Sequence, residues 1–369
     1  MIEQLRSLTL EQKIGQLFFI GIGGPDLDTA TERLLKEVSP GGVCLFARNI
    51  REAQQTRDLL DAIRERSVVL PFLSIDQEGG LVDRLRRVLT PMPVANKITN
   101  ALQAAELGSI VAGGLRILGF NMDFAPVVDV IDDERAGQTN GLMSREFGRS
   151  KEDVVELAGA FLTSLQNAGI IGCLKHFPGL GASQVDSHEE LPQVLIDEDE
   201  LANVDLFPYS GLLKTGKISA VMAAHAAFPQ HRLQELDENG KLLPSSLSKN
   251  FISTLLRGRL GFDGLVITDD LEMGAIVRNY GIGDACKMAV NAGVDMLAIC
   301  ADEGRIREGY KAVLDAVRSG EIPEAWINES LVRIAAVRSK LSEPSEFDQN
   351  KLSVLSERIT ALNEDLSKS

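Results

Sequence analysis

A carboxylate and an imidazole stand two residues apart in the segment Asp186-Ser187-His188. A locally extended backbone would place both side chains on one side of the chain, close enough to pair. Because a neighbouring carboxylate favours the protonated imidazolium, we expect His188 to hold a proton that it can release near neutral pH. The pair therefore predicts a general acid, a group that protonates a departing atom.

A second polar pair, Lys175-His176, ends an apolar run that begins at Ile170. Such a run predicts a buried strand that delivers Lys175 and His176 at its tip. Two of the four histidines of the chain thus fall close together, with glycines between them. This concentration predicts an active-site loop.

The elements that must position these groups alternate between strands and helices. Eight short apolar runs predict strands at 18–22, 43–46, 72–75, 122–130, 173–177, 220–228, 265–268 and 294–300. Helical periodicity occupies the intervening segments, at 51–66, 101–118, 151–166, 201–214, 248–260, 284–292 and 303–317. Because eight right-handed crossovers return a chain to its start, we predict an α/β fold of the (β/α)8 TIM-barrel type; a doubly wound sheet is the alternative.

Further helices are expected outside the eight units. A capping box from Thr9 to Gln12 predicts a helix before the first strand, and helical patterns at 323–341 and 350–365 follow the last one. A chain of 369 residues suits one barrel domain. We predict a catalytic domain over 1–345 and a C-terminal helical extension over 346–369 that packs on the barrel.

Polar residues collect where the predicted strands end: Arg48, Asn49, Asp76, Asp129, Lys175, His176, His225, Asp269 and Asp270. The C-terminal strand ends of a barrel open onto one face, so we expect these side chains to converge in one cavity. Any one of them could instead be a helix cap or a structural carboxylate. Asp270 is predicted to be such a supporting residue, His225 is open between the two roles, and His231, in a polar stretch, is expected to be solvated.

Composition excludes several classes of partner and cofactor. The net charge of −15 and the absence of a Lys/Arg block argue against nucleic acid and against an anionic membrane surface. The N-terminus lacks a basic leader with an apolar core, and we find no run long enough to span a bilayer, so we expect a soluble cytoplasmic protein without membrane insertion. No obligate protein partner is implied.

The cysteines and glycines indicate no cofactor. Cys44, Cys173, Cys286 and Cys300 lie far apart and are expected to be buried thiols, not disulfides or a zinc cage. The histidine spacing suggests no metal site, and the glycines at 21–24 lack the full dinucleotide fingerprint. We therefore predict neither a metal nor an organic cofactor.

Four stretches carry a resemblance to a known family: Leu45-Phe46-Ala47-Arg48-Asn49-Ile50, Asp76-Gln77-Glu78-Gly79-Gly80, the lysine-histidine loop that runs on to His188, and Gly264-Leu265-Val266-Ile267-Thr268-Asp269-Asp270-Leu271-Glu272-Met273. With further landmarks at 124–130, 144–148 and 244–248, the chain resembles glycoside hydrolase family 3 over residues 8 to about 300. It is most similar to the single-domain β-N-acetylglucosaminidase branch.

The resemblance implies catalytic roles that suit the residue types. Asp269, the first aspartate after the hydroxyl residue of the seventh strand, would be the nucleophile of a retaining glycosidase. His188 would be the acid and then the base, and Asp186 would hold the imidazole in its tautomer. A retaining enzyme needs an ionised carboxylate on one face of the anomeric carbon and a proton donor on the other.

The resemblance also implies how the sugar is held. Asp76 would accept hydrogen bonds from two hydroxyls, and Arg84, Arg145, Lys175 and His176 would donate. The implied activity is an exo-β-N-acetylhexosaminidase that removes N-acetylglucosamine from anhydro-muropeptides in cell-wall recycling. Leu81 and Asp83 replace polar and amide residues common in the family, and Leu180 replaces a frequent histidine, which leaves the aglycone preference open.

Other readings stay open at this point. A histidine acid would not repel phosphate as a carboxylate would, so a retaining phosphorylase fits the same residues, as does a related family 3 β-glycosidase. Larger two-domain β-glucosidases of the family place the acid in a separate domain and are less similar. Lys175 could instead form a Schiff base, as in barrel aldolases. A catalytically silent sugar-binding barrel would lack the nucleophile or the acid, and both are present.

Overall fold

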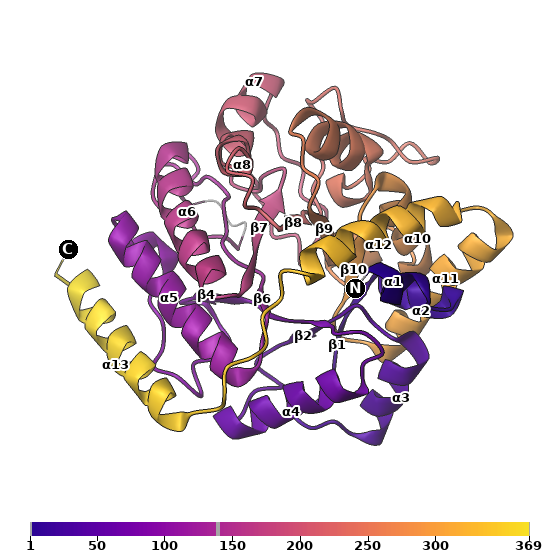
Figure 1. Ribbon diagram of the computed structural model, residues 1–369. Coiled ribbons are helices and arrows are strands. Elements are labelled where there is room, and N and C mark those ends of the chain that lie inside the picture. Colours follow the sequence, from indigo (N-terminus) through magenta and orange to yellow (C-terminus); the bar gives the residue numbers. More distant parts are fainter. Residues whose placement is uncertain (1, 138–140, 369) are drawn as a thin grey trace.

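Eight parallel strands close into a barrel surrounded by helices (Figure 1). The structure is a computed structural model and describes residues 2–137 and 141–368. Around the barrel the strands follow the order β1-β10-β9-β8-β7-β6-β3-β2. Their bounds are β1 Phe18–Gly21, β2 Gly42–Leu45, β3 Phe72–Ile75, β6 Met122–Asp123, β7 Ile171–Phe177, β8 Ala220–Ala223, β9 Leu265–Asp270 and β10 Met296–Ile299. The predicted (β/α)8 barrel is therefore confirmed, and the doubly wound sheet is wrong.

Two predicted strands are much longer than the observed ones. The runs 122–130 and 220–228 leave the barrel after Asp123 and Ala223 respectively. The residues that follow, such as Val128 and Ala226, are nevertheless buried. An apolar run reports burial and not hydrogen bonding, so these loops resembled strands.

The helices follow the predicted pattern with local differences. They are α2 Leu10–Gly15, α4 Ala53–Arg66, α5 Ala101–Leu118, α6 Lys151–Asn167, α8 Leu206–Leu213, α10 Ile282–Ala292, α11 Glu303–Ser319, α12 Glu324–Arg338 and α13 Gln349–Leu366. The predicted capping box is present in α2, where the Thr9 hydroxyl accepts from the Gln12 N–H at 3.3 Å. The first part of the predicted helix 201–214 (η2, Leu201–Asp205) and the helix within 248–260 (η4, Asn250–Arg259) have π-helical hydrogen bonding.

Three elements near the site or the barrel wall were not predicted. Helix α3 (Thr29–Val38) joins β1 to β2 and is capped by Asp28, whose side chain accepts from the Thr31 N–H at 2.8 Å. A short hairpin of β4 (Gln77–Gly79) and β5 (Val82–Asp83) follows β3, and α9 (Gly274–Val277) follows β9. The hairpin and α9 are too short to show a hydrophobic period, whereas α3 has one, with Leu34, Leu35 and Val38 buried, and the sequence analysis missed it.

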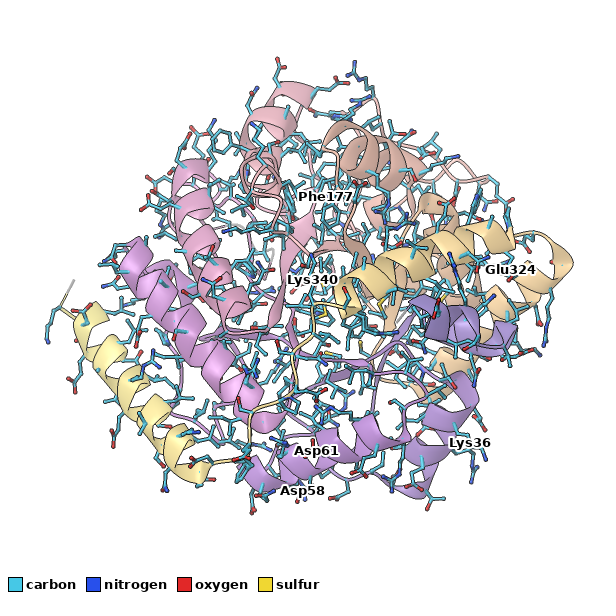
Figure 2. The ribbon with its side chains drawn as sticks, viewed as in Figure 1. Lys36, Asp58, Asp61, Phe177, Glu324 and Lys340 are labelled. Carbon is cyan, nitrogen blue, oxygen red and sulfur yellow. The ribbon has the colours of Figure 1, made fainter. Side chains whose placement is uncertain are left out.

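The barrel interior is packed with side chains. Phe19 of β1 points inward and meets the rings of Phe72 and Phe124 at 5.9 and 5.2 Å between centroids. Gly42 leaves room for this ring, because a Cβ there would lie 2.2 Å from it. Phe177 lies inside the molecule, whereas the charged side chains of Lys36, Asp58 and Glu324 lie at its edge (Figure 2). The barrel is thus a filled core.

The C-terminal helix α13 lies against α5 on the outside of the barrel (Figure 1). Arg358 of α13 pairs with both carboxylate oxygens of Glu106 at 2.8 and 2.9 Å. Among the described helices, α5 alone has the length and composition to cross a membrane, which the sequence analysis overlooked, and 61% of it is buried in the fold. The boundary between 345 and 346 stays a prediction.

Candidate active site

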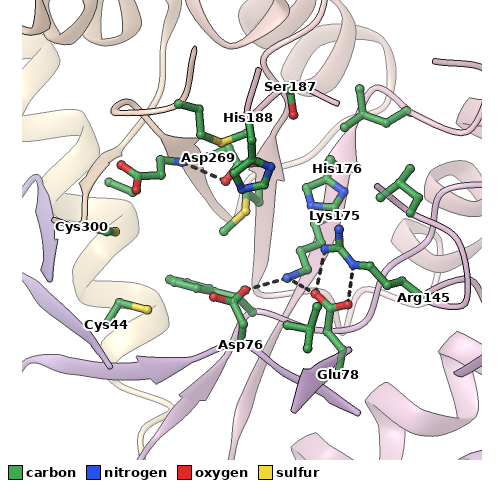
Figure 3. A pocket seen from close by; sticks show the side chains of 18 of the residues that line it. Cys44, Asp76, Glu78, Arg145, Lys175, His176, Ser187, His188, Asp269 and Cys300 are labelled. Carbon is green, nitrogen blue, oxygen red and sulfur yellow. Dashed lines mark hydrogen bonds and ion pairs between the residues drawn. The ribbon is translucent and has the colours of Figure 1, made fainter. Parts of the chain in front are cut away.

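A cavity of about 160 Å³ opens at the C-terminal ends of the strands. All eight residues predicted for catalysis or sugar binding line it: Asp76, Arg84, Arg145, Lys175, His176, Asp186, His188 and Asp269. Figure 3 shows that groups such as Asp76, Lys175 and Asp269 reach the cavity from segments that lie far apart in the sequence. The predicted convergence on one face of the barrel is therefore confirmed for these residues.

Asp269 stands at the end of β9, directly after the buried Thr268. Its Oδ1 accepts the backbone N–H of Asp270 at 2.8 Å. Burial works against ionisation, but the fields of His176 and His225 and this N–H hold the pKa of Asp269 below its usual value. Asp269 is therefore an ionised carboxylate facing the cavity.

Asp270 lines the same cavity, although neighbours on a regular strand point to opposite sides. The pairing of β9 with β10 shifts register near Ala298, which breaks the alternation at this point. Asp270 Oδ1 also accepts the Glu272 N–H at 3.0 Å, so the predicted supporting role is present as well. Burial raises the pKa of Asp270 to about 7, which leaves two adjacent carboxyl groups with different protonation.

The predicted pair of His188 and Asp186 is present. Asp186 Oδ1 lies 2.8 Å from His188 Nδ1 and also accepts the His188 backbone N–H at 2.9 Å. The backbone turns here, since the Glu189 N–H donates to the Asp186 carbonyl at 3.0 Å, so the extended conformation that we predicted is wrong. The His188 side chain is 71% exposed and is free to meet a ligand that enters from solvent.

A network of ion pairs forms the opposite wall of the cavity (Figure 3). Lys175 Nζ lies 2.7 Å from Asp76 Oδ1 and 2.5 Å from Glu78 Oε1. Arg145 makes a two-bond contact with Glu78, at 2.8 and 2.9 Å. Burial favours the neutral amine of Lys175, but Asp76 and Glu78 raise the pKa of Lys175 above its usual value. Lys175 is therefore held as a cation, a state that does not favour the Schiff-base reading, which needs a free amine.

Glu78 is a site residue that the sequence analysis did not single out. It lies on β4, is 4% exposed and contacts both cations of the wall. Burial opposes its ionisation, yet Lys175 and Arg145 hold the pKa of Glu78 far below its usual value. The β4–β5 hairpin that carries it is held by Gln77, which donates to Asp83 at 2.8 Å. Only its place in the segment 76–80 could have indicated it.

His176 is oriented by Asp129, which lies at the end of the predicted strand 122–130. Asp129 Oδ2 lies 2.7 Å from His176 Nδ1, and Asp129 Oδ1 accepts the Leu180 N–H at 2.7 Å. Because an ionised carboxylate only accepts, the Nδ1 proton points to Asp129 and Nε2 is left for a ligand. The register of β7 shifts between Leu174 and Phe177, and both Lys175 and His176 reach the cavity.

Several strand-end residues support the site from outside the cavity. Arg48 and Asn49 donate to the Ile22 carbonyl, each at 3.0 Å, and so hold the loop after β1. Arg84, by contrast, lines the cavity, and its guanidinium lies 6.0 Å from the centre of the Phe46 ring. The expectation that every strand-end residue faces the cavity is therefore wrong for Arg48, Asn49, Asp129 and His225, none of which lines it.

The two remaining histidines are buried. His225 lies between the Ser246 hydroxyl, at 2.7 Å from Nδ1, and the Asp270 carbonyl, at 3.1 Å from Nε2, and burial lowers the pKa of His225. Nδ1 is thus held by a side-chain hydroxyl and Nε2 supports the backbone beside Asp269, which decides for the structural role. His231 is 9% exposed and accepts the Leu233 N–H, so the predicted solvation of His231 is wrong.

Cysteines and metal ligands complete the inventory. The four cysteines are free and buried, as predicted, and Cys44 and Cys300 line the cavity. Across residues 2–137 and 141–368 no cluster of three His, Cys, Asp or Glu side chains could hold a metal ion.

Comparison with known proteins gives the family. Residues 9–337 match the glycosyl hydrolase family 3 N terminal domain. The chain belongs to glycoside hydrolase family 3. It is 33% identical to a β-hexosaminidase from Tolumonas auensis over 318 residues, which covers 85% of this chain and 89% of that protein. It is 36% identical to a β-hexosaminidase from Pseudomonas aeruginosa over 290 residues, 77% of this chain and 82% of the relative.

A solved structure of the family has the same fold. A glycoside hydrolase family 3 β-N-acetylglucosaminidase from Paenibacillus sp. str. FPU-7 superposes with a TM-score of 0.87 at 34% identity, over 96% of this chain and 69% of that one. This family 3 member is therefore a glycosidase, as the resemblance implied.

Proposed function

We propose that the chain is a retaining exo-β-N-acetylhexosaminidase that releases terminal β-linked N-acetylglucosamine. The observation that carries the proposal is that the ionised Asp269 and the His188–Asp186 pair line the same small cavity. The family 3 relatives named as β-hexosaminidases support the choice of sugar.

Asp269 acts as the nucleophile in this mechanism. A carboxylate oxygen bonds to the anomeric carbon while the bond from that carbon to the glycosidic oxygen breaks. The Nε2 proton of His188 passes to the departing oxygen. The products of this first step are the free aglycone, a glycosyl ester on Asp269 and a neutral His188.

His188 then acts as the base. Its Nε2 takes a proton from a water molecule, whose oxygen bonds to the anomeric carbon as the ester bond to Asp269 breaks. Two inversions leave the configuration unchanged, and Asp269 and His188 regain their starting states. Asp186, 2.8 Å from His188 Nδ1, keeps the proton on that nitrogen so that Nε2 faces the reaction.

The polar wall holds the sugar ring. Asp76 accepts from ring hydroxyls, Arg84, Arg145 and Lys175 present donors, and His176 offers its Nε2. A volume of about 160 Å³ is below the roughly 300–1,000 Å³ of pockets for drug-sized ligands, which suits one sugar ring and exo cleavage.

The proposed physiological substrates are anhydro-muropeptides that carry N-acetylglucosamine, cleaved in the cytoplasm during cell-wall recycling. The support is the likeness to the single-domain branch of the family. Purified enzyme should release N-acetylglucosamine from p-nitrophenyl N-acetyl-β-glucosaminide and from an anhydro-muropeptide. Faster cleavage of the plain β-glucoside would contradict the proposal and favour a related family 3 β-glycosidase.

A retaining phosphorylase is the second candidate, and a specific observation favours it. The acid/base group is an imidazole and not a carboxylate, so it does not repel an incoming phosphate. Turnover with and without inorganic phosphate decides between the two. We expect free N-acetylglucosamine in both cases. Formation of the sugar 1-phosphate would instead show that the enzyme is a phosphorylase.

A further inference from the structure

The position of His188 is set by its backbone and not by packing of its side chain. The imidazole is largely exposed, and its ring contact is with Asp186 of the same turn. The turn itself is joined to the segment after β9 by two hydrogen bonds. The Gly274 N–H donates to the His188 carbonyl and the Ala275 N–H donates to the Ser187 carbonyl, each at 3.1 Å.

Gly274 fits closely under this turn. A Cβ at position 274 would lie 2.4 Å from the Glu189 carbonyl oxygen and 2.6 Å from the His188 carbonyl oxygen. Gly274 is not among the glycines with positive φ, so its backbone conformation does not require glycine. The need for glycine at this position is therefore the close approach of the turn.

A second glycine meets the turn from another segment. At Gly141 a Cβ would lie 2.6 Å from Asp186 Oδ2, and Gly141 has a φ of 73°. A substitution at Gly141 would strain its own backbone as well as displace Asp186. Gly274 is thus the cleaner position at which to move the turn alone.

We propose that Gly274 is a positioning residue that sets how far the His188 proton lies from the glycosidic bond that Asp269 attacks. Gly274 lies five residues after Asp269 on the same segment, so nucleophile and acid/base are held in register by the two backbone hydrogen bonds. This inference rests on the proposed role of His188.

The Gly274→Ala variant tests the inference. The new methyl group must separate from the Glu189 carbonyl by about 1 Å to reach the 3.4 Å of ordinary contact. A misplacement of about 1 Å can cost on the order of 10²-fold in rate. We expect kcat/KM to fall by that order for an N-acetylglucosaminide with a poor alkoxide leaving group, and to stay near the wild-type value for the 2,4-dinitrophenyl glycoside, which needs no proton.

Two measurements separate positioning from a general structural effect. On the dinitrophenyl substrate kcat of the variant, unlike kcat/KM, should fall, because water needs the base to release the glycosyl ester. Azide, a nucleophile that needs no base, should restore this kcat. A slow fluorinated N-acetylglucosaminyl donor should still label Asp269. Gly281→Ala is the matched control, because a Cβ there meets its nearest atom, Glu308 Oε1, at 3.9 Å; it should behave as wild type on both substrates.

The outcomes are distinct. Equal losses of kcat/KM on both substrates, no loss on either, or failure of the variant to fold and label Asp269 would overturn the inference. His188→Ala is measured in parallel and should show the same selectivity for leaving group more strongly. If His188→Ala shows no selectivity, the proposed acid/base is wrong; if only Gly274→Ala lacks it, the positioning role is wrong.

Discussion

Replacing Glu78 by glutamine should destabilise the protein by about 3 kcal/mol. The Glu78 carboxylate is buried and contacts two cations, Lys175 at 2.5 Å and Arg145 at 2.8 Å. Removing one partner of a buried ion pair typically costs about 3–5 kcal/mol, because a charge is left without compensation. Asp76 still pairs with Lys175 at 2.7 Å in the variant, so we expect the lower end of this range.

Urea denaturation followed by far-UV circular dichroism measures this difference as a shift in midpoint. The matched control is Glu324→Gln, which removes a pair with Lys13 whose glutamate is 52% exposed. Exposed pairs contribute roughly 0–1 kcal/mol, so the control should differ little from wild type. If Glu78→Gln costs no more than the control, the electrostatic account of the polar wall is wrong.

The same variant has a predicted pH dependence. Although burial opposes ionisation, Lys175 and Arg145 depress the folded-state pKa of Glu78. A carboxylate with a depressed pKa contributes stability that is fully present above the unfolded value of about 4.3 and is lost as the pH falls toward the folded pKa. The difference between wild type and Glu78→Gln should therefore narrow below about pH 4. A difference that stays constant from neutral pH to about pH 3 would refute the reasoning.

Three further predictions concern the acid, the carboxyl group next to the nucleophile and the outer helix. His188→Ala should lose on the order of 10²–10⁴ in kcat/KM for poor leaving groups and little for dinitrophenyl; equal losses would contradict the acid role. Burial raises the folded pKa of Asp270 to about 7, so wild-type stability falls as pH rises from about 4 to 7. Asp270→Asn should therefore be more stable than wild type by on the order of 2–4 kcal/mol at pH 8, but not at pH 4. An equal difference at both pH values in urea denaturation would contradict this pKa. Leu355 of α13 packs against Gly113 of α5, 3.2 Å from where a Cβ on Gly113 would lie. Deleting residues 346–369 uncovers this part of α5 and should lower the melting temperature; an unchanged melting temperature would show that α13 is dispensable.

The barrel could be predicted because its strands are buried on both faces. Runs such as 72–75 are then apolar apart from the buried Ser74 and end at a charged residue, here Asp76, which marks the functional face. The limits of strands β6 and β8 could not be predicted, since the loops that follow them are buried as deeply as the strands.

The site was partly predictable for a related reason. Asp186 and His188 are close in sequence, so their pairing could be read directly, although the turn depends on the Asp186 side chain accepting a backbone N–H. Glu78 depends on Lys175 and Arg145, of which Arg145 lies 67 residues away. His231 has polar neighbours in sequence but packs near Phe251, at 6.0 Å between rings. Contacts at such separations are set by the closed barrel and leave no local pattern.

Covalent labelling tests the central claim most directly. The enzyme is incubated with a slow fluorinated N-acetylglucosaminyl donor, digested and sequenced by mass spectrometry with fragmentation that distinguishes Asp269 from Asp270. We predict one sugar per chain, attached to Asp269, with turnover that retains the anomeric configuration. A label on another residue, or inversion of configuration without any label, would contradict the mechanism in which Asp269 and His188 act on opposite sides of the cleaved bond.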